Sequence, residues 1–174
     1  MTASGARSPG KAAAPAAGFT LLEMAVVMGV IAILTLMALP SYLDRIVRKQ
    51  IEASLPLAEV AKRPVVAAWA LTQTMPVDNL EAGLPPADKI VGNYVSAVQV
   101  VRGAIHVTFG NSANGALKGK VLSLRPAVVE DAAIVPPAWV CGNAAVPAKM
   151  TVMGENRTSV PNAYLPLECA GRKP

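Results

Sequence analysis

One long apolar segment near the N-terminus narrows the possible structures of this chain to a few classes. The 21 residues from Phe19 to Leu39 carry a single charged side chain, Glu23. A helix of this length extends about 30 Å, which matches the hydrocarbon thickness of a bilayer. The 18 residues before it are rich in Ala, Gly and Pro, and they cannot bury enough apolar surface to fold alone. We therefore expect a leader followed by a membrane-spanning helix.

Three interpretations of this segment compete: a cleaved secretory signal, an ordinary signal anchor, and a short leader joined to a retained helix. The first is weakened because the apolar stretch is long and Pro40 stands where a small-residue cleavage site is needed. An ordinary anchor leaves Glu23 unexplained, since an ionisable group in lipid costs at least a few kcal/mol and is retained for a partner or a function. A favourable interaction of Glu23 with its own helix dipole does not explain why the carboxylate lies in lipid.

The residues around Gly18 resemble a known processing site. The stretch Gly18-Phe19-Thr20-Leu21-Leu22-Glu23 is followed by an unbroken apolar helix. It is similar to the start of type IV prepilins of the type IVa-like class, and to that of the related type II secretion pseudopilins. The similarity continues to Arg48 without a gap. It implies that a prepilin peptidase cuts between Gly18 and Phe19 and then N-methylates Phe19. It also implies that Glu23 meets the N-terminal amine of a neighbouring subunit, so that a buried charge becomes paired only on docking.

Pro40 follows the apolar stretch and cannot donate a hydrogen bond to the carbonyl of Leu36, so we expect a kink or an opened turn there. The resemblance assigns Pro40 to assembly and implies an unwound stretch just before it in filaments. The usual glycine position of that stretch is held by Ala32, while Gly29 lies about one turn earlier.

Beyond Tyr42, apolar residues recur at helical spacing and predict an amphipathic helix that ends near Thr74. Pro56 and Pro64 interrupt this half, and we expect bends or a break there. The expected buried stripe consists of Ala53, Leu57, Val60, Ala61, Val65, Ala68 and Leu71.

The second half of the chain predicts a sheet. Apolar segments bounded by turn residues predict strands at Tyr94–Val101, Ala104–Phe109, Val121–Pro126 and Ala138–Cys141. Arg102-Gly103 predicts a tight hairpin, and residues 111–119 predict a longer turn. The expected fold class is α+β, a long N-terminal helix packed on a four-stranded antiparallel sheet. The expected domains are a leader at 1–18, an apolar membrane and assembly helix at 19–42, and a globular domain at 43–174.

Cys141 and Cys169 are the two cysteines of the chain, and no metal-ligand spacing surrounds them. We expect a disulfide and an oxidising compartment, the alternative being two free thiols in a cytosolic protein. Closing the loop stabilises the fold by roughly 3–4 kcal/mol on the chain-entropy model. The segment between the cysteines resembles the disulfide-bounded variable loop of type IV pilins. Basic residues flank the apolar helix on both sides, so their distribution does not settle the orientation. The expected disulfide places the C-terminal part outside the cytoplasm, and the resemblance implies the same placement.

The remaining composition gives no sign of catalysis or nucleic-acid recognition. The formal net charge of +5 falls to +3 once Arg7 and Lys11 leave with the leader, which is typical of an ordinary surface. His106 stands alone on a predicted strand, and the chain has neither a nucleophile elbow nor a phosphate loop. We expect no enzyme activity, no cofactor and no metal, and a surface or packing role for His106.

The expected function is a structural subunit of a type IV pilus. The resemblance implies a single-pass stage in the inner membrane, then polymerisation into an extracellular filament that serves adhesion, twitching motility or DNA uptake. The implied partners are further copies of the chain, the prepilin peptidase and N-methyltransferase, the pilus assembly machinery, the membrane, and host surfaces or DNA. Two alternatives stay open: a minor pilin or secretion pseudopilin, and a periplasmic binding domain on a simple anchor.

Overall fold

The computed structural model describes residues 18–130, 132 and 134–171, with the side chains of residues 38–41 left out. The expected leader therefore lies outside the described residues, apart from Gly18. The element order is α1 (Leu21–Thr72), the 3-10 turn η1 (Ala87–Lys89) and five strands, which are bounded below. The chain divides after Leu39 into two compact units, and each is described by itself.

Helix α1 begins at Leu21 because Thr20 caps it. The Thr20 hydroxyl accepts a hydrogen bond from the Glu23 N–H at 3.2 Å, as in the first half of a capping box. The helix ends at Thr72, two residues earlier than expected. Gln73 follows with a left-handed φ of 53°, which is a common way to terminate a helix.

The break expected at Pro56 and Pro64 is absent, since α1 is helical through both residues and across Pro40 as well. Each proline removes one backbone hydrogen bond, and the carbonyls left without a donor in this half are those of Glu52 and Val60. Both of these residues are exposed to solvent, where water can replace the missing donor. The opposite face of the helix stays packed, so the local loss does not open the helix.

The expected buried stripe of α1 is partly wrong. Ala61 and Val65 are buried as expected and Leu57 packs against the core, but Val60 is 51% exposed and Leu71 is 85% exposed. Apolar residues also lie on the outward side of this half of α1, so the spacing alone does not select the face that meets the sheet. The buried positions recur every three or four residues and are Val47, Ile51, Ser54, Ala58, Ala61, Val65 and Trp69.

The sheet is antiparallel, and its strand order is β1-β2-β3-β4, with β5 paired to β3 off this path. β2 (Ala104–Phe109) and β4 (Ala138–Cys141) have the predicted bounds. β1 (Val95–Val101) begins one residue later than predicted, and β3 (Val121–Val128) is two residues longer. β5 (Thr151–Val152) was not predicted, because two residues are too few to show a period.

The predicted turns are confirmed. Arg102 and Gly103 have φ values of 50° and 78°, which a two-residue type I′ hairpin requires, and they join β1 to β2. The register of that pair shifts once, between Val95 and Ala97. The turn over residues 111–119 leads into β3 as expected. Four strands, a long helix and the disulfide confirm the α+β fold class.

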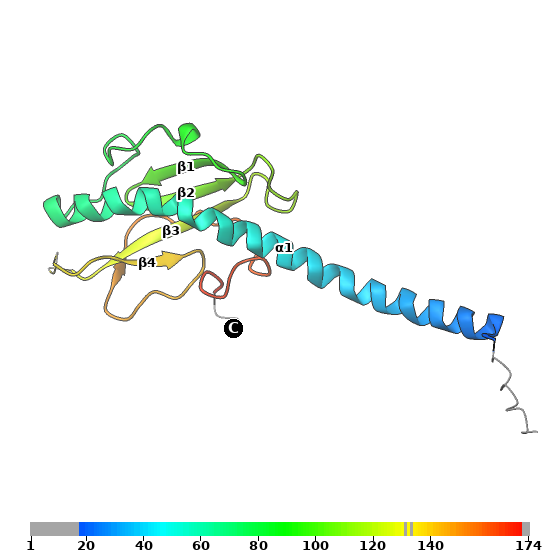
Figure 1. The fold of residues 1–174 in the computed structure, drawn as a ribbon. Helices are drawn as coiled ribbons and strands as arrows, with labels where there is room; N and C mark the ends of the chain where they lie inside the picture. The colour runs from blue at the N-terminus through cyan, green and yellow to red at the C-terminus, as the bar shows by residue number, and fades with distance from the viewer. Residues whose placement is uncertain (1–17, 131, 133, 172–174) are drawn as a thin grey trace, which may run out of the picture. The chain divides into compact units, whose positions relative to one another are not determined.

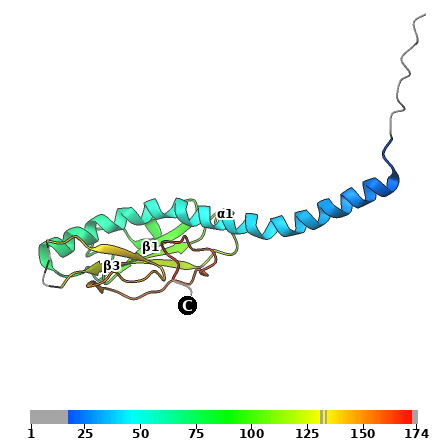
Figure 2. The same ribbon diagram turned by 90° about the horizontal axis from the view of Figure 1, so that it is seen from below.

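The core of the globular unit lies between α1 and the sheet. Figures 1 and 2 show the second half of α1 running across one face of the sheet. The side chains packed there from the strands are fully buried and include Ile105, Val107, Phe109 and Leu122. The opposite face is covered too, because five of the six β2 residues are buried instead of alternating.

Two stretches of sheet edge that lack a strand partner are closed by side chains of neighbouring loops. The Asn79 side chain accepts a hydrogen bond from Val100 N–H at 2.6 Å and donates one to Val98 O at 3.0 Å, along the free edge of β1. Beyond the end of β4, Ser123 N–H donates to the Thr158 hydroxyl at 3.1 Å. These contacts supply the ladder partners that each edge lacks.

Candidate assembly site

The apolar half of α1 is unburied in the single chain. Every residue from Gly18 to Met37 is exposed, and the most apolar 18-residue window of the helix is 0% buried. By length and composition the helix is able to cross a membrane. A continuous apolar surface of this size requires lipid or other helices around it. This half of α1 is therefore the strongest candidate for an interaction surface.

Glu23 lies in the first turn of this apolar half. Its backbone N–H donates to the capping Thr20, and no hydrogen bond or ion pair of the described residues includes its carboxylate. Phe19 and Glu23 are four residues apart, the spacing at which helical neighbours meet. Sequence reasoning did not identify the Thr20 cap, although the Thr-x-x-Glu pattern before an apolar run is its usual signal.

The two residues of the expected processing site precede the helix. Gly18 and Phe19 are exposed, and Phe19 is 79% exposed. A Cβ added to Gly18 has no atom within 4 Å, so nothing in the described chain encloses this residue. The peptide bond between them is thus outside the helical hydrogen-bond ladder and open to an external enzyme. The side chain of Pro40, the other expected assembly residue, lies outside the described side chains.

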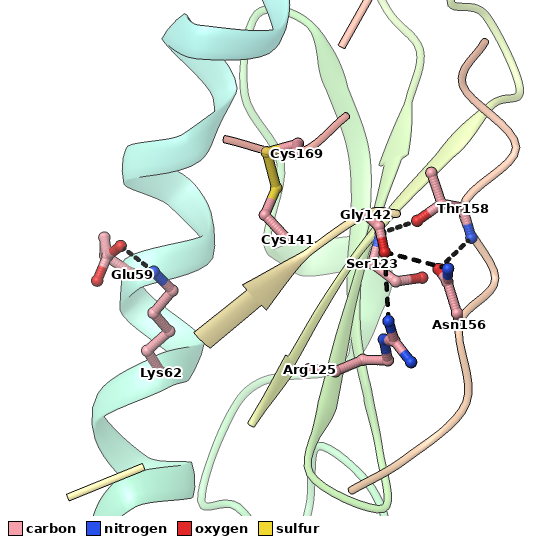
Figure 3. The surroundings of a disulfide bond; sticks show 9 residues. All are labelled: Glu59, Lys62, Ser123, Arg125, Cys141, Gly142, Asn156, Thr158 and Cys169. Carbon is pink, nitrogen blue, oxygen red and sulfur yellow. Dashed lines mark hydrogen bonds and ion pairs between the residues drawn. A yellow bond between two sulfur atoms is a disulfide. The ribbon is translucent and has the colours of Figure 1, made fainter. Parts of the chain in front are cut away.

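Cys141 and Cys169 form a disulfide, which Figure 3 shows between the end of β4 and the C-terminal segment. Their Cα atoms are 4.5 Å apart, and Cys169 is buried in the core. Gly142 follows with a φ of 54°, and a Cβ there would lie 2.7 Å from the Cys169 carbonyl oxygen. Only glycine fits this close approach, so Gly142 and the disulfide together fix the end of β4.

The C-terminal segment between the two cysteines is held by polar side chains as well as by the disulfide. Figure 3 shows Asn156 and Thr158 directed at the ends of β3 and β4. The Asn156 amide donates to Gly142 O at 3.1 Å, and the Ser159 hydroxyl accepts from Val121 N–H at 2.9 Å. Nearby on α1, Lys62 pairs with Glu59 and lies 5.4 Å from the centre of the Trp139 ring.

His106 has a packing role, which is one of the two roles expected for it. It is 3% exposed, and its Nδ1 lies 2.9 Å from the Ser123 hydroxyl, which also accepts a hydrogen bond from Arg157 N–H. Burial, together with the nearby Arg157 cation, lowers the pKa of His106 from 6.5 to about 4, while Glu155 partly opposes the shift. Within the described residues, no group of His, Cys, Asp and Glu side chains is arranged to hold a metal ion.

Comparisons with known proteins match both units. A family model described as pilin, a bacterial filament protein, matches residues 47–170, and a model of the prokaryotic N-terminal methylation motif matches residues 14–39. A type IV major pilin protein, PilE1, of Neisseria gonorrhoeae is 33% identical over 159 residues, covering 87% of this chain and 86% of the relative.

Two further relatives are named fimbrial proteins. One, of Neisseria meningitidis, is 36% identical over 126 residues, which cover 72% of each chain. The other, EcpC of Eikenella corrodens, is 35% identical over 114 residues, covering 62% of this chain and 72% of the relative. The matches therefore extend over the globular unit and the apolar segment alike.

Proposed function

The chain belongs to the type IV pilin family and is a structural subunit of a pilus, and from this premise we propose how it is processed, stored and assembled. Prepilin peptidase removes the leader, residues 1–18, by cutting between Gly18 and Phe19, and then N-methylates Phe19. Residues 19–42 are the membrane and assembly helix, and residues 43–174 are the globular domain. The match to the methylation motif and the exposed Gly18-Phe19 bond support this step.

After processing, the mature chain is stored in the inner membrane as a single-pass subunit. The apolar half of α1 spans the bilayer, and the globular unit lies on the extracytoplasmic side, where the disulfide can form. The pilus assembly machinery then extracts the subunit and adds it to the filament. Its role is structural and not catalytic.

The observation that carries this proposal is an exposed apolar helix with a carboxylate near its start and no partner for that carboxylate among the described residues. An apolar surface drives helices together, but a lone carboxylate makes docking costly unless a cation meets it. The new α-amino group of Phe19 in a second copy supplies that cation. Subunits shifted out of register leave both charges unpaired, so the pair selects one register.

The outward face of the second half of α1 gives the filament a further contact surface. Its exposed residues are mostly small or apolar, and the exposed carbonyls opposite Pro56 and Pro64 lack helical donors. A neighbouring subunit can cover this face without disturbing the core beneath it. The members of the face are Ala53, Pro56, Val60, Ala67 and Leu71.

The test is to purify surface filaments from the source cell and to measure the N-terminus and the intact mass of their major polypeptide. We expect a chain that starts at Phe19 and carries one additional methyl group. A membrane-only protein that retains Met1 would contradict both processing and assembly, and would favour a binding domain on a simple anchor. Finding the chain at a filament tip only, or in short periplasmic fibres, would favour a minor pilin or a pseudopilin.

The assembled filament serves adhesion, twitching motility or DNA uptake in this proposal, through host-surface or DNA contacts of the globular units. Measuring attachment, surface spreading and transformation in a deletion strain separates the three activities. If the deletion strain keeps all three activities, this part of the proposal is wrong, while the structural role in the pilus stands.

A further inference from the structure

A basic and aromatic face lies on the first turns of the globular part of α1. Its members are Tyr42, Arg45, Ile46 and Lys49, which we call the collar. Tyr42 and Ile46 are four residues apart, as are Arg45 and Lys49, so the two pairs lie along one side of the helix and form one face. Tyr42 is 63% exposed, Arg45 and Lys49 are exposed, and Ile46 is half-buried. The collar thus presents two cations flanked by apolar surface.

The collar follows the apolar segment closely along the chain. Arg45 and Lys49 come six and ten residues after Leu39. Helical side chains point back towards the N-terminus, and the stems of Arg and Lys are long and apolar. When the apolar segment spans a bilayer, the short separation along the chain keeps both cations close to the headgroup layer.

The two charges of the collar are free for an external partner, whereas the neighbouring cation Arg48 is bound within the chain. None of the ion pairs found among the described residues includes Arg45 or Lys49. Arg48 differs, because its guanidinium donates to Ala163 O at 2.7 Å and ties α1 to the C-terminal segment. Arg48 therefore serves the fold, whereas Arg45 and Lys49 have no such internal role.

A groove of about 400 Å³ is formed at the collar, and its lining combines the collar residues with Arg48 and Glu52. Glu52 lies at the end of the groove that is farther along the chain from the apolar segment. The end nearer the apolar segment along the chain is consequently cationic and is bounded by Tyr42. Tyrosine is enriched at the membrane interface, where its ring meets acyl chains and its hydroxyl meets water.

We propose that the collar binds the anionic headgroups of phospholipids in the extracytoplasmic leaflet while the subunit is stored in the membrane. This inference rests on the proposed function, because it requires the apolar segment to span the bilayer. The phosphate of the lipid meets Arg45 and Lys49, and Tyr42 and Ile46 contact the upper acyl chains. Anionic lipid attracts each nearby basic residue, which gives a positive charge on this side of the membrane a purpose.

The test uses the processed chain, which starts at Phe19, in nanodiscs of phosphatidylcholine that contain a minority of phosphatidylglycerol. Native mass spectrometry counts the lipids of each kind that remain on the released protein. We expect phosphatidylglycerol to be retained about tenfold above its bulk fraction, as two basic contacts near an anionic surface allow. The double substitution Arg45→Gln and Lys49→Gln should return this enrichment to near one.

The matched control is Lys118→Gln with Lys120→Gln, which removes two exposed lysines from the turn before β3. This control should keep the full enrichment, and both double variants should melt like the parent. Equal retention of the two lipids by the parent, or unchanged enrichment in the collar variant, would overturn the inference. An enrichment lost in both variants would also overturn it, because net charge alone would then explain the binding.

The filament yield of the same variants separates this inference from the proposed function. If filaments assemble from the parent but it shows no lipid preference, the collar inference is wrong and the pilus subunit stands. If the collar variant loses filaments while the parent lacks any lipid preference, the collar contacts a second copy of the chain instead of lipid. A chain that does not remain in the nanodisc would overturn both the membrane stage and the collar.

Discussion

At the scale of single residues, Glu23 is the side chain on which ordered assembly depends. We expect Glu23→Ala to leave processing at Gly18 intact, because the substituted residue lies beyond the cut, but to lower filament yield at least tenfold. The reason is that the Phe19 amine of the neighbour loses its partner and remains a buried, unpaired cation, which costs several kcal/mol. Sheared filaments and N-terminal sequencing of the membrane pool measure the two steps separately.

The control for this substitution is Glu168→Ala, which removes an exposed carboxylate from the C-terminal segment of the globular unit. It should process and assemble like the parent. Filaments at parental yield from Glu23→Ala would count against charge pairing, and an uncut Glu23→Ala precursor would show that the carboxylate acts in processing instead.

His106 should make the stability of the globular unit depend on pH. Its pKa is about 4 in the folded chain, whereas an unperturbed histidine has a pKa of 6.5, so the unfolded chain binds a proton first as the pH falls. The contribution of neutral His106 to the free energy of unfolding is fully present above pH 6.5. It is lost as the pH decreases towards 4, by up to about 3 kcal/mol. Thermal unfolding in detergent followed by near-UV circular dichroism checks this. In His106→Gln the slope over this interval should be much smaller; an equal slope would assign it to other groups.

At the scale of elements, neighbouring residues of α1 should respond in opposite ways because they lie on different faces. Ala61 is 0% exposed, so Ala61→Asp buries an unpaired charge and should destabilise the unit by more than about 3 kcal/mol. Val60 is 51% exposed, and Val60→Asp should change stability by less than about 0.5 kcal/mol yet reduce filament yield. Chemical denaturation and sheared-filament yields distinguish the two. Equal destabilisation would contradict the assigned helix face.

The strands were predictable and the helix face was not, for a physical reason. Turn residues such as Arg102-Gly103 fix where a strand ends through their own backbone conformation, so local sequence is sufficient. The face of α1 is selected by the sheet, which packs on Val47 and Ile51 although the outward side is also rich in Ala and Val. Likewise, the contacts of Thr158 with Ser123 join residues far apart in the chain, and no local pattern announces them.

The residues of the candidate site show the same difference between local and non-local signals. Gly18, Phe19 and Glu23 were identified because their motif is local and contiguous in the chain. Their roles in processing and assembly remain predictions. The cap at Thr20 is equally local and was not predicted, although Thr20 and Glu23 have the spacing of a capping box.

At the scale of the whole molecule, the disulfide joins the sheet to the C-terminus and should dominate its resistance to proteolysis. Replacing both Cys141 and Cys169 by serine should cost about 3–4 kcal/mol on the chain-entropy model and expose the segment between them to cleavage. Limited proteolysis with mass mapping measures this, and reduction of the parent should reproduce the result. Unchanged protease resistance in the double variant would show that the polar contacts of Asn156 and Thr158 suffice.

The closed sheet edges have a consequence for a polymer in which many copies are crowded together. An open edge invites the backbone of a neighbour to add as a strand, and such ladders become amyloid-like and hard to reverse. In this chain Asn79 and the segment around Thr158 occupy edge positions that a second copy would otherwise use. A second copy is thereby left with side-chain contacts instead of backbone pairing at these two edges, which keeps the subunits of a crowded polymer separately folded.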